Sequence, residues 1–235
     1  MKTVLTYLFL AAICIQANAQ DDKRGYLTLG FGPSIPFSDF SSTSTGNDDA
    51  GYAMAGGNLN ITFAYRLGNN LGLTAMLTGT SNVVDEDAIA ADFNENYPGA
   101  TWTIGADRWR IGGLMVGGFA TFPASENLSF DVRLLGGVLN STMPQIRATA
   151  VSGIAGATAT REEKTAAAPT FDLGFMFRYK VGGSLCLLAG ADFIGANPTF
   201  NDVKTTTSFG SSSTADIDQS YSTMNINIGI GILLK

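Results

Sequence analysis

Hydrophobic and polar residues alternate along much of this chain. Between residues 58 and 67 the odd positions carry large apolar side chains and the even positions are mostly polar. The same alternation resumes at Leu71 after the break Gly68-Asn69-Asn70. A period of two is typical of a β-strand with one apolar face, and a glycine-asparagine break between two such runs predicts a tight hairpin turn.

Further segments repeat this pattern, so the chain is predicted to be all-β with eight strands. The glycine pairs at 112–113 and 117–118 interrupt one of these segments, and its phase is not fixed by the alternation. The additional predicted strands cover residues 26–33, 109–122, 128–139, 171–180, 184–193 and 224–234.

Short and long connections alternate between the predicted strands. Short turns fall near 68–70, 124–127 and 181–183, and long polar segments fall around 35–55, 81–106, 141–167 and 195–222. This order predicts an antiparallel up-and-down barrel with both termini at one rim. Short turns at one end and long external loops at the other are typical of transmembrane barrels of the bacterial outer membrane.

Composition indicates which face of such a barrel is apolar. The polar parity is mostly Asn, Thr, Ser and Gly, which suits the crowded interior of an eight-stranded barrel. Only 14% of the residues are charged, against about 25% in typical soluble domains. We therefore expect the apolar parity to face lipid. The alternative is a soluble, lipocalin-like periplasmic barrel that binds an apolar ligand, with Phe63, Phe130, Phe175 and Phe177 facing inward.

Charged residues on the polar parity nearly balance in sign, as expected of groups that pair inside a confined lumen. Aromatic residues near strand ends are predicted to form interfacial girdles. The predicted structural charge network of the lumen consists of Arg66, Arg110, Asp131, Arg133, Asp172, Arg178 and Asp192. The predicted girdle consists of Tyr65, Trp109, Phe122, Tyr179 and Phe193, and Tyr26, which is off the apolar parity, is predicted at the rim.

The amino-terminal segment has the layout of a secretory signal peptide. A positive start is followed by an apolar run from Val4 to Ile15 and by the small-x-small site Ala17-Asn18-Ala19. We expect cleavage after residue 19, which leaves 20–235 as the barrel domain. Cys186 is then the only cysteine and is expected to be an inert core residue. The net charge of −6 gives no support to a nucleic-acid partner.

Several stretches resemble the outer-membrane β-barrel domain (porin-like) family of small eight-stranded barrels. They are YLTLGFGPSIPFSDF, FAYRLGNNLGLTAML, FATFPASENLSFDVRLLGGVL and NINIGIGILL. The resemblance covers essentially all of residues 20–235. It implies a monomeric protein of the outer membrane of Gram-negative bacteria, surrounded by outer-membrane lipid and inserted by the outer-membrane assembly machinery.

The residues available for catalysis are few. The chain contains no histidine, so arrangements that need a histidine base are excluded, and a single cysteine cannot build a thiolate zinc site. Catalysis by carboxylates alone would have to use Asp131, Asp172 and Asp192, for which structural ion pairs are the better interpretation. We expect a non-enzymatic protein without a metal or cofactor.

The acidic segment around residue 90 has part of a calcium-loop pattern. Asp92, Asn94 and Asn96 have the one-three-five spacing, but Tyr97 stands where glycine is needed and Thr103 where glutamate is needed. A solvated loop is therefore expected.

The preferred hypothesis is a structural or surface-interaction protein that acts through its external loops, with an unknown external partner. A narrow pore for small solutes is the second hypothesis.

Overall fold

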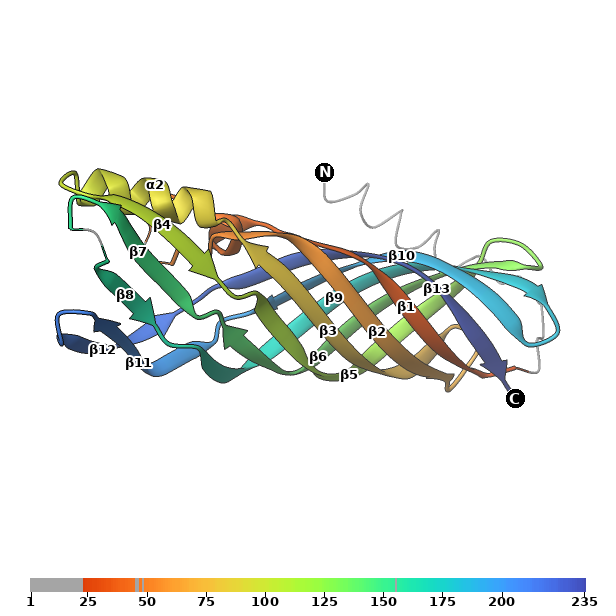
Figure 1. Cartoon of the computed structure of the whole chain (residues 1–235). Helices are drawn as coiled ribbons and strands as arrows, with labels where there is room; N and C mark the ends of the chain where they lie inside the picture. Colours follow the sequence, from red (N-terminus) through yellow and green to blue (C-terminus); the bar gives the residue numbers. More distant parts are fainter. Residues whose placement is uncertain (1–22, 45–46, 48, 155) are drawn as a thin grey trace, which may run out of the picture.

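The computed structural model describes residues 23–44, 47, 49–154 and 156–235, and the predicted signal peptide lies outside them. Eight strands close into one antiparallel barrel, which confirms the predicted fold class (Figure 1). The barrel strands are β1 (Gly25–Pro36), β2 (Ala53–Arg66), β3 (Leu71–Val84), β5 (Trp109–Pro123), β6 (Leu128–Met143), β9 (Lys164–Gly182), β10 (Leu185–Ala196) and β13 (Tyr221–Leu234).

Barrel strands that follow one another in the chain are neighbours in the wall, and pairing of β1 with β13 closes it. Apolar residues stand opposite apolar residues across the ladders: Leu29 is paired with Ile61 on one side and with Ile230 on the other. This register keeps one face apolar around the wall, because a slip by one residue would reverse every side chain. A closed ladder leaves no unpaired strand edge in the wall.

The two ends of the barrel differ. At the short-turn end the chain reverses through residues 67–70, 124–127 and 183–184, as predicted, and Gly25 is paired with Leu234 at the same end. The long-loop end carries the four long connections that were predicted as external loops, and these connections contain regular secondary structure that the sequence pattern did not predict. These connections contain η1 (Ser38–Ser41), α2 (Glu86–Asn96), β4 (Thr101–Ala106), β7 (Ile146–Ser152), β8 (Thr158–Arg161), β11 (Thr199–Thr207) and β12 (Ser212–Asp218).

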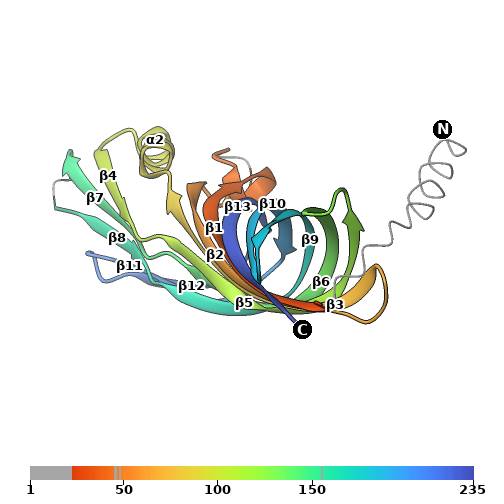
Figure 2. The ribbon, with the colours of Figure 1, turned by 90° about the vertical axis from the view of Figure 1, so that its right-hand side faces the viewer.

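Strands β4, β7, β8, β11 and β12 form a second, five-stranded sheet in the order β12-β11-β8-β7-β4, which we term the outer sheet. It extends beyond the long-loop end, as Figure 1 shows. Figure 2 views the barrel from the short-turn end, with the outer sheet reaching away to one side. Barrel strands of 12 to 19 residues exceed the ~9–11 residues that a strand needs to span a bilayer.

The apolar parity faces outward, as expected for a lipid-facing wall. Phe63, Phe175 and Phe177 are 46%, 44% and 52% exposed, which contradicts the inward positions required by the soluble-barrel alternative. Water-soluble monomers rarely expose contiguous apolar patches above a few hundred Å². None of the helices in the described part of the chain is long and apolar enough to cross a membrane. The exposed apolar side chains include Leu27, Leu29, Leu59, Ile61, Leu73, Leu77, Leu114, Val116, Leu134, Val138, Leu187, Ile226, Ile228, Ile230 and Ile232.

This wall supports a direct test of the lipid-facing surface. Ile228 lies in the middle of β13 and is 56% exposed on the outer face. The substitution Ile228→Arg is expected to lower the free energy of unfolding in lipid vesicles by about 2–4 kcal/mol, the cost of a basic residue near the bilayer midplane. Urea titration of protein refolded into vesicles measures this. As a control, Ser213→Arg on the exposed β12 should change the free energy of unfolding by less than about 0.5 kcal/mol. Equal effects at both positions would contradict the assignment of Ile228 to the lipid-facing surface.

Candidate functional site

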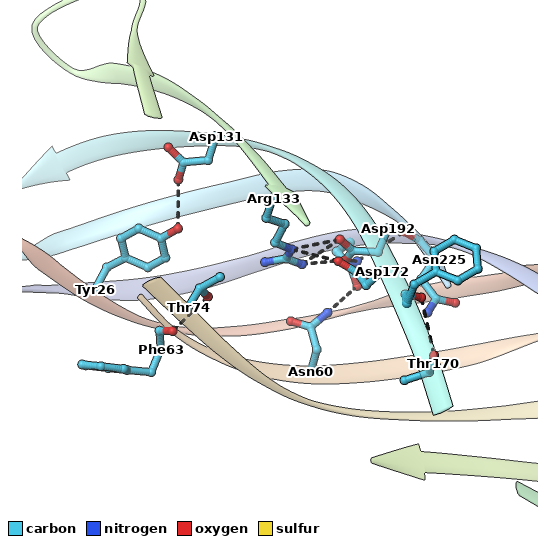
Figure 3. A network of polar contacts seen from close by, with 12 residues as sticks. Tyr26, Asn60, Phe63, Thr74, Asp131, Arg133, Thr170, Asp172, Asp192 and Asn225 are labelled. Carbon is cyan, nitrogen blue, oxygen red and sulfur yellow. Dashed lines mark hydrogen bonds and ion pairs between the residues drawn. The ribbon is translucent and has the colours of Figure 1, made fainter. Parts of the chain in front are cut away.

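The middle of the lumen holds a cluster of buried charges, shown in Figure 3. Arg133 of β6 donates hydrogen bonds from one terminal nitrogen to both carboxylate oxygens of Asp192 of β10, at 2.7 and 2.8 Å, and from Nε at 3.2 Å. Asp172 of β9 lies beside this pair, with Oδ1 at 3.7 Å from Arg133 Nε. These three predicted network residues come together in the lumen.

A glycine that the sequence reasoning missed makes room for the cluster. Gly174 is paired with Arg133 on one side and with Asp192 on the other. A Cβ at this position would lie 2.3 Å from Asp192 Oδ1 and 2.4 Å from Arg133 Nε. The sequence feature that could have indicated this space is a glycine on the polar, lumen-facing parity of β9, between the outward-facing Leu173 and Phe175.

Asparagines extend the cluster across the lumen. Asn227 of β13 donates to Asp192 Oδ2 at 2.8 Å, and Asn60 of β2 donates to Asn227 Oδ1 at 2.9 Å. The chain of contacts thus links β6, β10, β13 and β2. A small cavity of about 10 Å³ remains among Arg133, Asp192 and these asparagines, which is about the space of one water molecule. Side chains therefore fill the lumen at this level.

A second group of charges lies nearer the short-turn end. Tyr26 donates to Asp131 Oδ2 at 3.0 Å, and an Arg178 nitrogen lies 3.5 Å from Asp131 Oδ1. The Arg178 guanidinium also lies 4.3 Å from the centre of the Tyr26 ring, in reach of a cation–π interaction. Tyr26 was predicted at the rim. It is only 2% exposed and points into the lumen, where Asp131 accepts its hydroxyl hydrogen bond.

The two other predicted network residues lie elsewhere. Arg66 is at the short-turn end, where it donates to the backbone oxygen of Lys23 at 2.7 Å. Arg110 points out of the barrel and forms an exposed ion pair with Glu163, so its luminal placement was wrong. The inward and outward positions of this strand were assigned the wrong way round near Arg110, because its neighbours Trp109 and Ile111 are the residues that point inward.

Apolar side chains fill the long-loop half of the lumen, which was predicted to be polar. Phe40 of η1 stacks edge-on against Trp109 and Tyr221, with ring centres 5.4 and 4.9 Å apart, and Trp109 also lies 6.1 Å from Phe200. We term these four residues the aromatic plug. Trp109 was predicted in the lipid-facing girdle, but it is 2% exposed and donates to the backbone oxygen of Gly51. Buried side chains that pack with the plug include Met76, Ile111, Met115, Leu135, Leu139, Met143 and Ile194.

One edge of the outer sheet is covered by helix α2. Two backbone amides of edge strand β4 donate to helix side chains: Trp102 to Asn94 and Ala106 to Glu86, each at 2.8 Å. Trp102 also packs against Phe93 of α2, with ring centres 5.8 Å apart. An uncovered strand edge is a template for pairing with another chain, so α2 protects this edge.

The three residues with calcium-loop spacing belong to α2, so they do not form a calcium loop. Asp92 accepts a hydrogen bond from Tyr52 at the barrel rim, and Asn94 accepts from β4. Burial, reinforced by the hydrogen bond to Asp92, raises the pKa of Tyr52 to about 12. The hydroxyl therefore remains a donor at neutral pH and ties α2 to the barrel.

The opposite edge of the outer sheet is strand β12, which is paired with β11 alone among the described strands. Its residues are almost all exposed. Two acidic side chains of β12 fix the irregular pairing: Asp216 accepts from the backbone of Asp202 at 2.8 Å, and Asp218 accepts from Thr199 at 2.6 Å. The outer sheet thus has one covered edge and one open edge.

A closed eight-stranded antiparallel barrel with an apolar outer wall and a filled lumen defines a barrel of the outer-membrane type. Among solved structures, the chain is similar to a major outer membrane protein from Thermus thermophilus, with a TM-score of 0.51 and 12% identity over 90% of this chain and 99% of that one. It is also similar to neisserial surface protein A, with a TM-score of 0.47 and 10% identity over 89% and 97% of the two chains. For Ail, the attachment invasion locus protein of Yersinia pestis, the TM-score is 0.46, with 11% identity over 89% and 97%.

The similarity to the Thermus protein supports the fold class, and at this identity it concerns the fold alone. No protein-family model matches the sequence, and the search among curated proteins found no relative.

Proposed function

We propose that this protein is a non-enzymatic, integral outer-membrane barrel that binds an extended segment of an external protein along the open edge of β12. The observation that carries the proposal is the asymmetry of the outer sheet, whose β4 edge is protected by α2 while its β12 edge is bare. The apolar wall supports a location in lipid, and in the proposed orientation the long-loop end with the outer sheet faces away from the cell. The predicted signal peptide is consistent with export.

The packing of the lumen argues against the pore hypothesis. The aromatic plug fills the long-loop half, and the Arg133–Asp192 cluster with its asparagines crosses the middle. An eight-stranded barrel has an interior only wide enough for its own side chains. A solute path would require both layers to move aside.

The chemistry of the chain argues against catalysis. There is no histidine, and the carboxylates of Asp131 and Asp192 are engaged by arginines in the lumen. These side chains lie in a filled interior and not in a cleft that could admit a substrate. A structural role fits them better than an acid–base role.

The partner can be described by its chemistry. Addition of a strand to a sheet edge gains affinity from backbone hydrogen bonds and specificity from alternate side chains. Strand β12 carries serines, threonines and the acidic residues Asp216 and Asp218. A partner strand with lysine or arginine at alternate positions would complement this edge, because opposite charges across paired strands are favourable.

A proline in the open edge tests this proposal. The hydrogen bond from Thr207 to Ser211 fixes the ladder pattern, and the alternation of pairs leaves the amide of Thr214 pointing to the open side. The probe is a labelled extended peptide that alternates lysine with valine. We expect Thr214→Pro to weaken its binding to the purified barrel at least about tenfold, because the amide donor is lost and the edge is blocked.

Thr214→Ala is the matched control, since it retains the amide and should bind as the wild type does. All samples must show the mobility shift on boiling in SDS that a closed barrel gives, which separates loss of binding from loss of the fold. Unchanged peptide binding by a folded Thr214→Pro barrel would refute the role of the β12 edge.

A further inference from the structure

The buried charges of the lumen do not cancel. Asp131, Asp172 and Asp192 are 2%, 0% and 3% exposed, and the arginines that contact them are Arg133, 6% exposed, and Arg178, whose side chain is 13% exposed. Among the described residues, the two luminal groups of charges together therefore contain three carboxyl groups and two guanidinium groups. If every carboxyl group were ionised, the interior would carry one uncompensated negative charge.

Geometry assigns the excess charge to Asp172. Arg178 forms an ion pair with Asp131, and Arg133 donates its hydrogen bonds to Asp192. The 3.7 Å between Arg133 Nε and Asp172 Oδ1 is too long for a hydrogen bond. Both oxygens of Asp172 lack a hydrogen-bond partner among the described residues.

The neighbours of Asp172 do not supply the missing charge. Its register partners are Leu135 of β6 and Ile194 of β10, which are both buried and apolar. The charged groups described around it are Arg133 from β6 and Asp192 from β10. On strand β13 the neutral Asn225 is the register partner of Asp192, is 1% exposed and has an Oδ1 that also lacks a hydrogen-bond partner in the described structure.

In Figure 3 the side chains of Asp172, Asp192 and Asn225 gather in one part of the lumen. Three unpartnered oxygen atoms thus belong to this region, the two of Asp172 and Oδ1 of Asn225. An isolated buried carboxylate is costly, and such a group takes up a proton or pairs with a cation instead. Carboxylate and amide oxygens are suitable ligands for hard cations.

We propose that the folded lumen takes up one unit of positive charge at Asp172, carried by a proton or by an alkali-metal cation that Asn225 helps to bind. One unit of positive charge suffices, because the luminal carboxylates outnumber the guanidinium groups by one. A divalent ion would leave the lumen with one excess positive charge. This inference is independent of the proposed binding at β12, since it concerns the opposite, enclosed part of the molecule.

The test compares urea unfolding of the wild type and of Asp172→Asn in neutral detergent micelles. If the charge is a proton, the unfolding equilibrium constant of the wild type rises about tenfold per pH unit between about pH 5 and pH 7, because the unfolded carboxyl group is already ionised there while folded Asp172 keeps its proton. If it is a metal cation, the constant rises about tenfold for each tenfold dilution of sodium or potassium, with choline chloride as the inert replacement salt. Asp172→Asn should abolish whichever dependence is found.

Asp131→Asn is the control, because Asp131 is already paired with Arg178 and Tyr26. It should lower stability but leave the pH or cation dependence in place. Infrared spectra of the wild type in heavy water provide a measurement that needs no variant, since a protonated carboxyl group has a carbonyl band distinct from that of a carboxylate. The proposal is overturned if the wild type shows neither that band nor cation dependence, or if Asp172→Asn retains the wild-type dependence.

Discussion

Replacing Arg133 by methionine is expected to lower the free energy of unfolding by about 3–5 kcal/mol, the usual cost of removing one partner of a buried ion pair. The substitution leaves the Asp192 carboxylate buried without the guanidinium group that donates hydrogen bonds to it, and methionine fills most of the vacated volume. Urea titration of the barrel in detergent micelles or lipid vesicles measures the change.

Arg110→Met is the matched control, because it removes the same type of side chain from an exposed ion pair. The side chains of Arg110 and Glu163 are 60% and 42% exposed, so this loss should cost less than about 1 kcal/mol. The double variant Arg133→Met/Asp192→Asn should regain part of the stability lost in Arg133→Met, because one buried carboxylate is removed with its partner. A cost at Arg133 no larger than that at Arg110 would show that the luminal cluster is not a stabilising pair.

The wall of the barrel could be predicted because each strand repeats one simple constraint. Lipid on one side and a packed lumen on the other impose a period of two, and Ile226, Ile228 and Ile230 with intervening Asn and Gly show it clearly. The turns were predictable for a related reason, since Gly68-Asn69-Asn70 interrupts the apolar pattern with residues that favour tight turns. Both signals are local in sequence.

The lumen was predicted less well because its contacts are not local. Seven charged residues were expected to share the interior, but the pairing of Arg133 with Asp192 depends on the registers of the intervening strand β9. Strand β5 shows the limit most clearly. Near Trp109 the lumen is apolar, so apolar residues no longer mark the lipid face, and alternation assigned Arg110 to the wrong side.

The strands of the outer sheet could not be predicted from the alternation of apolar and polar residues. Strand β12 is polar and exposed along almost its whole length, so it has no apolar face to produce alternation. Its conformation is set by pairing with β11, and the sheet is built from segments distant in sequence. The helical turns of α2 were missed because the segment is acidic and has a weak apolar stripe, with Ile89 as its only buried residue.

The aromatic plug supports the other prediction of large effect, which concerns Phe40. This residue is fully buried on the 3-10 turn η1 and contacts both Trp109 and Tyr221. Phe40→Ala is expected to lower the free energy of unfolding by about 3–5 kcal/mol, since the apolar contacts are lost and the surrounding strands cannot collapse into the space. Urea titration under the conditions used for Arg133 would measure this cost.

Phe209→Ala is the control with the same residue type, because Phe209 is 73% exposed in the turn between β11 and β12. Its replacement should therefore change the free energy of unfolding little.

The plug also predicts the behaviour of the wild type in planar bilayers, where no discrete conductance steps are expected from protein that is demonstrably folded. Steps in the wild type, together with a small stability cost for Phe40→Ala, would mean that the plug is loosely held and would restore the pore hypothesis. A large cost and a silent bilayer would mean that the long-loop half of the lumen acts as a solid core that supports the outer sheet.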